Sequence, residues 1–219
     1  MLRARRFVGF VGFVGFVGFV GFVGVVGMVP LRAQEVVVDR LLAVVNGDVV
    51  TRSDVRAARQ LRLLPGVATI DDEALVTQLI ERRLIVAELA RYAPAEPTAE
   101  QMTSRRQSWA STLPAGTNVP AALGGVGMRE TTLMSWLRDD LRIAAYLDQR
   151  FTAAAQPTRE QALTYFREHE SLFVVGGVLP EFSAVEADVR RRVAADRRAT
   201  RIRDWIESLK QRAEIRRIQ

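Results

Sequence analysis

The 219-residue chain contains no cysteine and only one histidine, His169. Without cysteine, the chain has no disulfide framework, no thiolate zinc site and no cysteine nucleophile. A single histidine also excludes a site that uses two histidines as ligands or catalysts. An all-carboxylate calcium or magnesium site is not excluded by these absences, but the sequence contains no acidic loop of the D-x-D-x-D-G type. The composition therefore predicts no metal site and no bound cofactor.

Lysine is nearly absent as well, because Lys210 is the only one and arginine supplies the other basic residues. The formal net charge of +6 arises mostly at the start of the chain, where residues 1–33 hold four arginines and no acidic residue. Residues 34–219 carry 27 basic and 25 acidic side chains, a balance of +2. A nearly neutral folded part gives no reason to expect nucleic-acid binding.

The N-terminal segment has the order of a secretory signal. Arginines lie within residues 1–6, no charged residue occurs from Phe7 to Val29, and Ala33 offers a small residue for cleavage. We therefore expect residues 1–33 to be a signal peptide. As a helix the uncharged stretch would rise about 35 Å, so an uncleaved membrane anchor stays open as the alternative. Against an anchor, a glycine at every third position lowers hydrophobicity and helix propensity.

Two runs rich in β-branched residues, 36–45 and 48–51, flank Asn46-Gly47. Asn-Gly between apolar runs predicts a hairpin turn, because both turn residues need a positive φ. Residues 213–218 are also predicted to be extended, and a lone strand must pair to satisfy its backbone groups. We therefore predict one small sheet in which the C-terminal strand joins the N-terminal hairpin, so that the first and last elements of a single domain meet.

Between the hairpin and the last strand, the sequence predicts helices separated by proline and glycine. We expect Ser53 to cap the first helix, which ends before Pro65, and Ser183 to cap the last. Thr98 with Gln101 three residues later predicts a capping box. The predicted helices begin at 53, 71, 98, 129, 159 and 183, with at most a short helix within 111–127.

The helix predicted over residues 129–151 carries one apolar arc of about 180°. Asp140 and Asp148 interrupt this arc, which indicates that part of it lies at a groove or an edge rather than in a dry core. Tyr146 falls on the polar side of the same helix. Trp205, in contrast, centres on the apolar stripe of the last helix, and we assign it to the core.

Residues 43–55 read Ala-Val-Val-Asn-Gly-Asp-Val-Val-Thr-Arg-Ser-Asp-Val and follow Val38-Asp39. Further segments, in chain order, are Leu79-Ile80-Glu81-Arg82-Arg83-Leu84-Ile85, Leu133 through Phe151, and Tyr165-Phe166-Arg167-Glu168-His169-Glu170. Together with the final helix and strand, these segments resemble the SurA N-terminal chaperone domain of periplasmic folding factors. The resemblance implies a mainly α fold, with one SurA N-terminal-like domain over 34–219, core helices within 53–171, and a closing helix and strand at 183–219.

Members of that family usually carry one or two parvulin-type prolyl isomerase domains between the penultimate and the final helix. Here only residues 172–182 lie between those predicted helices, which is too few for a domain. The parvulin site is built around histidines, whereas we interpret His169 as a solvated or packing residue. The resemblance thus implies the chaperone part of the family without its enzyme part, and we expect the chain not to be an enzyme.

The resemblance further implies a periplasmic chaperone that holds unfolded or nascent envelope proteins, including outer-membrane proteins, in an apolar groove without nucleotide. Adaptable methionine and aromatic side chains are typical of surfaces that accept many sequences. The predicted client-binding residues are Met102, Trp109, Met128, Met134, Trp136 and Tyr146. Trp136 and Met134, at the rims of the apolar arc, rank first among them.

Two other classes of protein stay open. The first is an enzyme, either a prolyl isomerase as the resemblance suggests or a hydrolase with paired carboxylates such as Asp139 and Asp140. The carboxylate pair is disfavoured because adjacent residues on a helix point about 100° apart. A membrane-anchored assembly or scaffold subunit would require that the N-terminal apolar stretch is retained. The basic runs at 190–192 and 197–198 interleave with acidic residues, which is typical of a solvated helix face. Contact of these runs with anionic lipid or acidic client segments is the alternative, and the oligomeric state is left open.

Overall fold

A computed structural model describes residues 39–92 and 94–218 of the chain. The predicted signal peptide, its cleavage after Ala33 and the alternative anchor through Phe7 to Val29 lie outside these residues. Within the described part, no helix is both long enough and apolar enough to cross a membrane. Contacts join the described residues into one compact unit.

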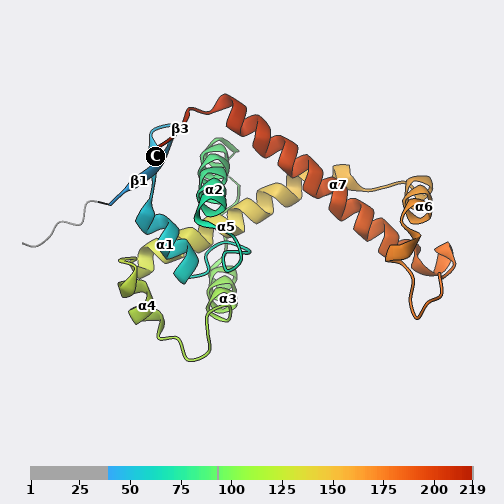
Figure 1. The fold of residues 1–219 in the computed structure, drawn as a ribbon, viewed down its shortest axis with the longest axis horizontal. Coiled ribbons are helices and arrows are strands. Elements are labelled where there is room, and N and C mark those ends of the chain that lie inside the picture. Colours follow the sequence, from blue (N-terminus) through green and yellow to red (C-terminus); the bar gives the residue numbers. More distant parts are fainter. Residues whose placement is uncertain (1–38, 93, 219) are drawn as a thin grey trace, which may run out of the picture. The chain divides into compact units, whose positions relative to one another are not determined.

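The Asn46-Gly47 turn establishes the sheet (Figure 1). These residues have φ values of 50° and 93°, which allows strand β1 (Leu41–Val45) to turn back into β2 (Asp48–Thr51). Strand β3 (Ile215–Arg217) pairs antiparallel with the other edge of β1, so the strand order is β2-β1-β3. The mainly α fold with one small sheet built from both ends of the domain is therefore confirmed.

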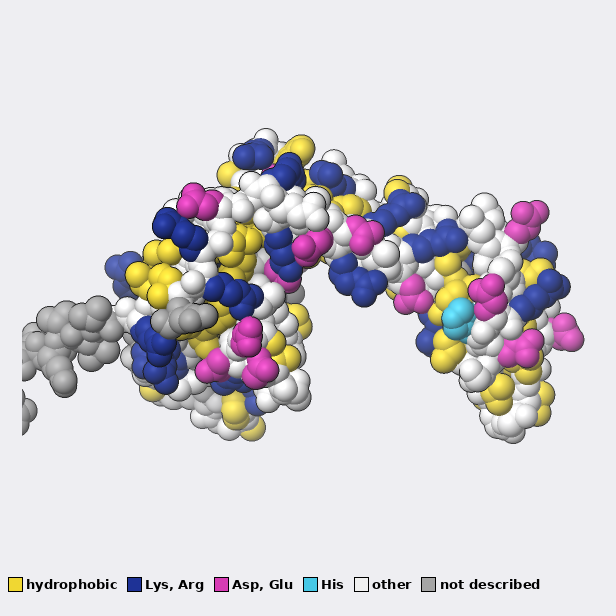
Figure 2. All heavy atoms as spheres, turned by 45° about the horizontal axis from the view of Figure 1, so that its top comes forward, with side chains coloured by type: hydrophobic (Ala, Val, Ile, Leu, Met, Phe, Trp, Pro, Cys, Tyr) yellow, Lys and Arg dark blue, Asp and Glu magenta, His cyan; other side chains and the backbone are white. Residues whose placement is uncertain are grey.

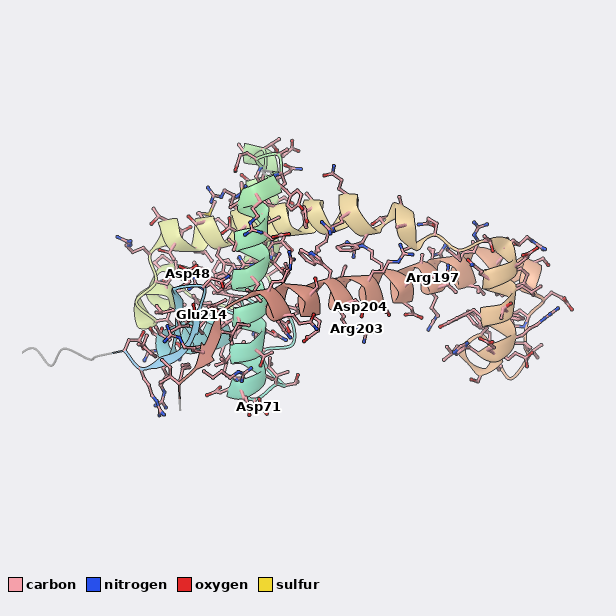
Figure 3. The ribbon with its side chains drawn as sticks, turned by 90° about the horizontal axis from the view of Figure 1, so that it is seen from above. Asp48, Asp71, Arg197, Arg203, Asp204 and Glu214 are labelled. Carbon is pink, nitrogen blue, oxygen red and sulfur yellow. The ribbon has the colours of Figure 1, made fainter. Side chains whose placement is uncertain are left out.

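Asn46 also holds the last strand in place. Its backbone N–H donates to the carbonyl of Glu214, and its side-chain oxygen accepts from the Glu214 N–H, both at 2.9 Å. Figure 3 shows Glu214 beside the hairpin that carries Asp48. One residue of the turn thus both forms the hairpin and captures the returning end of the chain.

Most other described residues are helical, in the predicted order. The short 3₁₀ turns Ala153–Ala155 and Glu170–Leu172 follow the helices that end at Phe151 and Glu168. The predicted capping box at Thr98 is present, since the Thr98 hydroxyl accepts from Gln101 N at 3.2 Å and the Gln101 side chain accepts from Thr98 N at 2.8 Å. The helices are α1 (Arg52–Gln60), α2 (Asp72–Tyr92), α3 (Ala99–Ala110), α4 (Val119–Gly125), α5 (Glu130–Phe151), α6 (Arg159–Glu168) and α7 (Phe182–Arg212).

Two helix starts differ from the prediction. Thr51, not Ser53, caps α1: its hydroxyl accepts from Asp54 N at 3.2 Å, and the Asp54 carboxylate accepts from Thr51 N at 3.0 Å. The reason is that β2 continues directly into the helix, so its last residue takes the cap. Helix α7 begins at Phe182, before Ser183, and has no side-chain cap. Burial of Phe182 holds that first turn instead.

The main cluster of buried side chains packs helices α1, α2, α3, α4 and α5 with the sheet and the C-terminal end of α7. Helix α2 is central, because it contacts β1, β2, α1, α5 and α7. Figure 3 shows α2 crossing both α5 and α7. The largest fully buried side chains in the main cluster include Leu61, Leu75, Leu89, Trp109, Leu133 and Leu137.

A second, smaller cluster lies between α6 and the N-terminal half of α7. We call it the α6 cluster, and its buried members are Ala162, Phe166, Phe173, Phe182, Val189 and Val193. Helix α7 joins the two clusters, since Trp205 and Leu209 at its other end belong to the main cluster. The core assignment of Trp205 agrees with this packing, with 7% of its surface exposed.

The position of Tyr146 corrects the prediction that it lies on the polar side of its helix. Only 6% of Tyr146 is exposed. Its ring packs between Tyr92 and Trp205, at centroid distances of 5.5 and 5.6 Å. Burial raises the pKa of Tyr146, although Arg150 donates to its phenol oxygen at 2.7 Å and opposes this shift. The helical pattern of α5 alone does not reveal this burial, because α7 arrives from much later in the sequence.

Candidate functional site: an apolar groove

An open groove lies between the α1–α2 loop and helices α2, α3 and α5, with a volume of about 1180 Å³. Arg198 of α7 completes its edge. Most of its wall is aliphatic, and the side chains that line the groove come from five separate stretches of sequence. The main aliphatic members are Leu63, Leu64, Val67, Ile85, Ile143 and Leu147.

The α1–α2 loop forms one wall, and Arg59 fixes it. The Arg59 guanidinium donates to the carbonyls of Val67 and Ile70 at 2.6 and 3.0 Å. It also pairs with Asp72, the first residue of α2, at 2.7 Å. Gly66, with a φ of 71°, provides the left-handed turn that closes the loop. An arginine that binds two loop carbonyls therefore holds an apolar loop open beside α2.

One aspartate in the groove bridges two helices. The Asp140 carboxylate of α5 lies 2.5 Å from Arg82 of α2 and 2.7 Å from Arg105 of α3. Burial lowers the pKa of Arg82, and the negative charge of Asp140 opposes this shift. The Arg82 guanidinium also stacks on the Trp136 ring, 3.8 Å from its centre, and donates to the Trp136 carbonyl at 2.9 Å. The Asp140 carboxylate thus offsets the positive charge of Arg82 and Arg105 at a wall that is otherwise mostly apolar.

Other polar groups line the groove and have no partner within the described residues. The side-chain oxygen of Gln78 and Nε of Arg198 are both buried and make no hydrogen bond there. In contrast, Glu81 pairs with Lys210 at 2.7 Å, and this hydrogen bond raises the pKa of Lys210.

Asp140 and Asp148, which interrupt the predicted apolar arc of α5, both line the groove. Asp139, next to Asp140, instead faces Arg138 and Arg142 at 3.3 and 3.8 Å. The two neighbouring carboxylates therefore have different partners and do not face one another. Within the described residues, no group of three or more His, Asp or Glu side chains is arranged to hold a metal ion.

The six predicted client-binding residues are not gathered in one place. Trp109 lines the groove, but only 2% of it is exposed, and its indole N–H donates to the Leu61 carbonyl at 2.7 Å. Tyr146 is buried under α7 and lies outside the groove lining. The other four residues are half-buried, pack against the main cluster and do not line the groove: Met102, Met128, Met134 and Trp136.

Sequence reasoning missed the loop wall of the groove. Leu63 and Leu64 precede the Pro65-Gly66 break, and the loop was predicted only as the end of a helix. The sequence signal for this wall is the pair of adjacent leucines directly before the helix break, which indicates apolar side chains on the loop. Ile143 and Leu147 lie within the apolar arc of α5, but the arc alone does not show which of its side chains line a groove and which are covered by another helix.

The basic runs of α7 are partly engaged with neighbouring side chains. Arg190 lies 3.7 Å from Glu186, and Arg191 pairs with Asp188 one turn earlier. Arg197 donates to Gln161 of α6 at 2.9 Å, and Figure 3 shows it nearer to α6 than Arg203 and Asp204 are. Figure 2 shows basic and acidic side chains interspersed along the surface that joins the two clusters. Such mixed charge is typical of a solvated helix face.

The fold is the one found in SurA-like chaperones. A solved structure reported with the virulence factor PEB4 and the periplasmic protein Cj1289, two SurA-like chaperones of Campylobacter jejuni, aligns with a TM-score of 0.54. The alignment covers 82% of this chain and 99% of the other, at 11% sequence identity. No family model and no curated protein matches the sequence. Similarity at this level of identity concerns the fold.

Proposed function

We propose that the protein is a nucleotide-independent chaperone of the cell envelope that binds unfolded segments of client proteins in the apolar groove. The groove between the α1–α2 loop and α5 carries this proposal, because it offers an aliphatic wall with few polar groups. Apolar burial is not directional, so such a wall accepts many sequences. The fold shared with SurA-like chaperones supports the same function.

Polar groups in the groove supply hydrogen bonds that do not depend on client sequence. Arg198, a half-buried side chain at the groove edge that forms no ion pair within the described residues, donates to a client carbonyl. The Asp140 bridge keeps the α2, α3 and α5 walls together while the groove is empty. Generic backbone contacts combined with apolar burial give broad and moderate affinity, which a chaperone that must release its clients requires.

The proposal includes a location and the lack of catalysis. Export by the predicted signal would place the protein in the periplasm, where unfolded envelope proteins are its clients. Helices α6 and α7 are joined by residues 169–181, and we infer no parvulin domain and no prolyl isomerase activity from this short connection. A membrane-anchored assembly subunit is the second candidate, and it rests on the uncharged stretch from Phe7 to Val29.

The experiment compares Ala144→Arg with Ala145→Arg in the full chain. Both alanines are exposed neighbours on α5, but only Ala144 lines the groove. Arginine has good helix propensity, so both variants are expected to fold. Binding of a urea-unfolded outer-membrane protein is measured by fluorescence anisotropy of a dye on that client.

We expect Ala144→Arg to weaken binding about tenfold or more, with Ala145→Arg close to the unchanged protein. Equal binding by both variants would reject the groove as the client site. Failure of the unchanged protein to bind or to suppress aggregation would favour the assembly subunit. A peptide isomerisation assay on the same samples is expected to show no acceleration.

A further inference from the structure

Exposed apolar side chains are concentrated in one short segment beside the α6 cluster. We call residues 172–179 the apolar tip, and residues 171–180 contain no charged side chain. Val175 and Val178 are 76% and 68% exposed, and Leu172, Val174 and Leu179 are exposed as well. Figure 2 shows hydrophobic side chains reaching the surface at the end of the protein that holds α6. Clustered exposure of this kind marks an interaction surface.

The apolar tip has a defined backbone. Gly176 and Gly177 have φ values of 60° and 82°, which gives a two-residue turn of the hairpin type. Val175 and Val178 close it through two backbone hydrogen bonds of 3.0 and 3.1 Å. At its base, Phe173 is buried in the α6 cluster. Because the turn is closed by hydrogen bonds and anchored by Phe173, its backbone loses little conformational entropy when the valines dock against a partner.

We infer that the apolar tip of one copy docks into the groove of a second copy. The groove is an aliphatic depression on the same chain, and the tip is a narrow aliphatic protrusion. The charges around the two surfaces are of opposite net sign. The tip is flanked by three exposed glutamates and one exposed arginine: Glu168, Glu170, Glu181 and Arg167. The groove lining holds four arginines against three carboxylates: Arg62, Arg82, Arg105 and Arg198 against Glu81, Asp140 and Asp148.

The tip reaches the groove of another copy, not its own. Arg198 at the groove edge and Phe182 after the tip lie on the same unbroken helix, α7. Sixteen residues of helix separate them, and at 1.5 Å per residue this corresponds to about 24 Å. Because each copy has one tip and one groove, reciprocal docking closes a twofold dimer.

The inference rests on the proposed function of the groove and adds a regulation to it. Docking of the tip covers the aliphatic wall when no client is present, so client and second copy compete for one site. The two contacts are small, and we expect a dimer that dissociates at micromolar concentration. A client in excess would then convert the dimer into client-bound monomers.

The first test uses disulfide trapping. The chain has no cysteine of its own, so no native thiol forms competing disulfides. Full-length Val178→Cys is mixed with full-length Ala144→Cys, which places one thiol on the tip and one in the groove. The control partner is Ala121→Cys, an exposed helical alanine outside the groove lining. We expect faster formation of the 178–144 disulfide than of the 178–121 disulfide. Equal rates would overturn the inference.

The second test measures mass by sedimentation and client affinity by anisotropy, for full-length Val175→Asp/Val178→Asp. Both positions are highly exposed, so the fold is expected to persist, and Val49→Asp, at an exposed valine on β2, is the control. We expect the tip variant to be less dimeric and to bind client more tightly, with the control unchanged. A dimer that persists in the tip variant, or an unchanged protein that never dimerises, would overturn the inference.

These measurements separate the inference from the proposed function. A tip-dependent dimer in a protein that binds no client would contradict the proposed chaperone function and leave the docking of the tip supported. Client binding that is lost in Ala144→Arg but unchanged in the tip variant would support the chaperone function and overturn the competition between tip and client.

Discussion

The main cluster and the α6 cluster differ in what holds them together. The main cluster combines six helices and the sheet, and its members come from residues 43 to 209. The α6 cluster has six buried residues from one short helix, one turn and half of α7. Long-range packing therefore supports the groove, whereas the apolar tip sits on a small local core. Helix α7 is therefore packed by distant parts of the chain at its groove end, and at its tip end mainly by the phenylalanines of the α6 cluster.

Removal of Trp109 tests the main cluster most severely. Trp109→Ala deletes a side chain that is 2% exposed and removes the hydrogen bond to the Leu61 carbonyl. We expect a loss of about 3 to 5 kcal/mol in the free energy of unfolding, because a large cavity opens and a carbonyl loses its partner. Urea denaturation followed by circular dichroism measures it. A loss below about 1 kcal/mol would show that Trp109 is not a core residue.

Phe166→Ala tests whether the α6 cluster unfolds separately. Phe166 contacts Phe173 and Phe182 at centroid distances of 5.3 and 5.7 Å, so its removal takes away the centre of this cluster. We expect a local destabilisation of about 3 kcal/mol. Hydrogen exchange should speed up in α6 and stay slow in α2 and α5. Uniformly faster exchange in all three helices would show that the two clusters unfold as one.

The Asp140 bridge links the charge at the groove to the stability of the main cluster. Asp140→Asn leaves the partly buried Arg82, with 10% of its side chain exposed, without a carboxylate partner. We expect a loss of about 2 kcal/mol in unfolding free energy. Asp139→Asn is the matched control, because its arginine contacts are longer, at 3.3 and 3.8 Å. Equal effects of the two substitutions would argue against the bridge.

The pair of Lys210 and Glu81 gives the smallest effect, and its sign follows from the raised pKa of Lys210. A raised pKa in the folded state means that the pair stabilises fully below the ordinary lysine pKa of about 10.4. This stabilisation is lost as the pH rises through the folded-state pKa. Between pH 9 and strongly alkaline pH, the free energy of unfolding should fall further in the unchanged protein than in Lys210→Met. We expect the difference between the two decreases to be under about 1 kcal/mol, and urea titration at each pH measures it. Parallel pH curves would contradict the expected contribution.

Much of the fold could be predicted because its signals are local. The Asn46-Gly47 turn and the Thr98 capping box depend on residues next to one another, and both are present. The same reasoning chose Ser53 and Ser183 as caps, because a serine before an apolar pattern is the usual local signal. Direct continuation of β2 into α1 gave the first cap to Thr51, and burial of Phe182 replaced the second.

The candidate site was less predictable, since it is assembled from distant stretches. The carboxylates of Asp140 and Asp148 correctly indicated a groove along α5. The six residues predicted to line it were all methionines or aromatics, and only Trp109 does so, whereas most of the wall consists of aliphatic side chains from the α1–α2 loop, α2 and α5. Amphipathic patterns show which helix face is apolar, but they do not show what covers it.

Local sequence patterns predicted the hairpin, the order of the helices, and a returning C-terminal strand that needs a partner. Backbone φ preferences, helix caps and apolar periodicity act over a few residues, so the sequence displays them directly. The burial of Tyr146, the groove wall formed by Leu63 and Leu64, and the bridge from Asp140 to two arginines arise instead from contacts between distant segments. Those outcomes depend on the contacts among α2, α5 and α7, because each of these helices covers apolar side chains of the others.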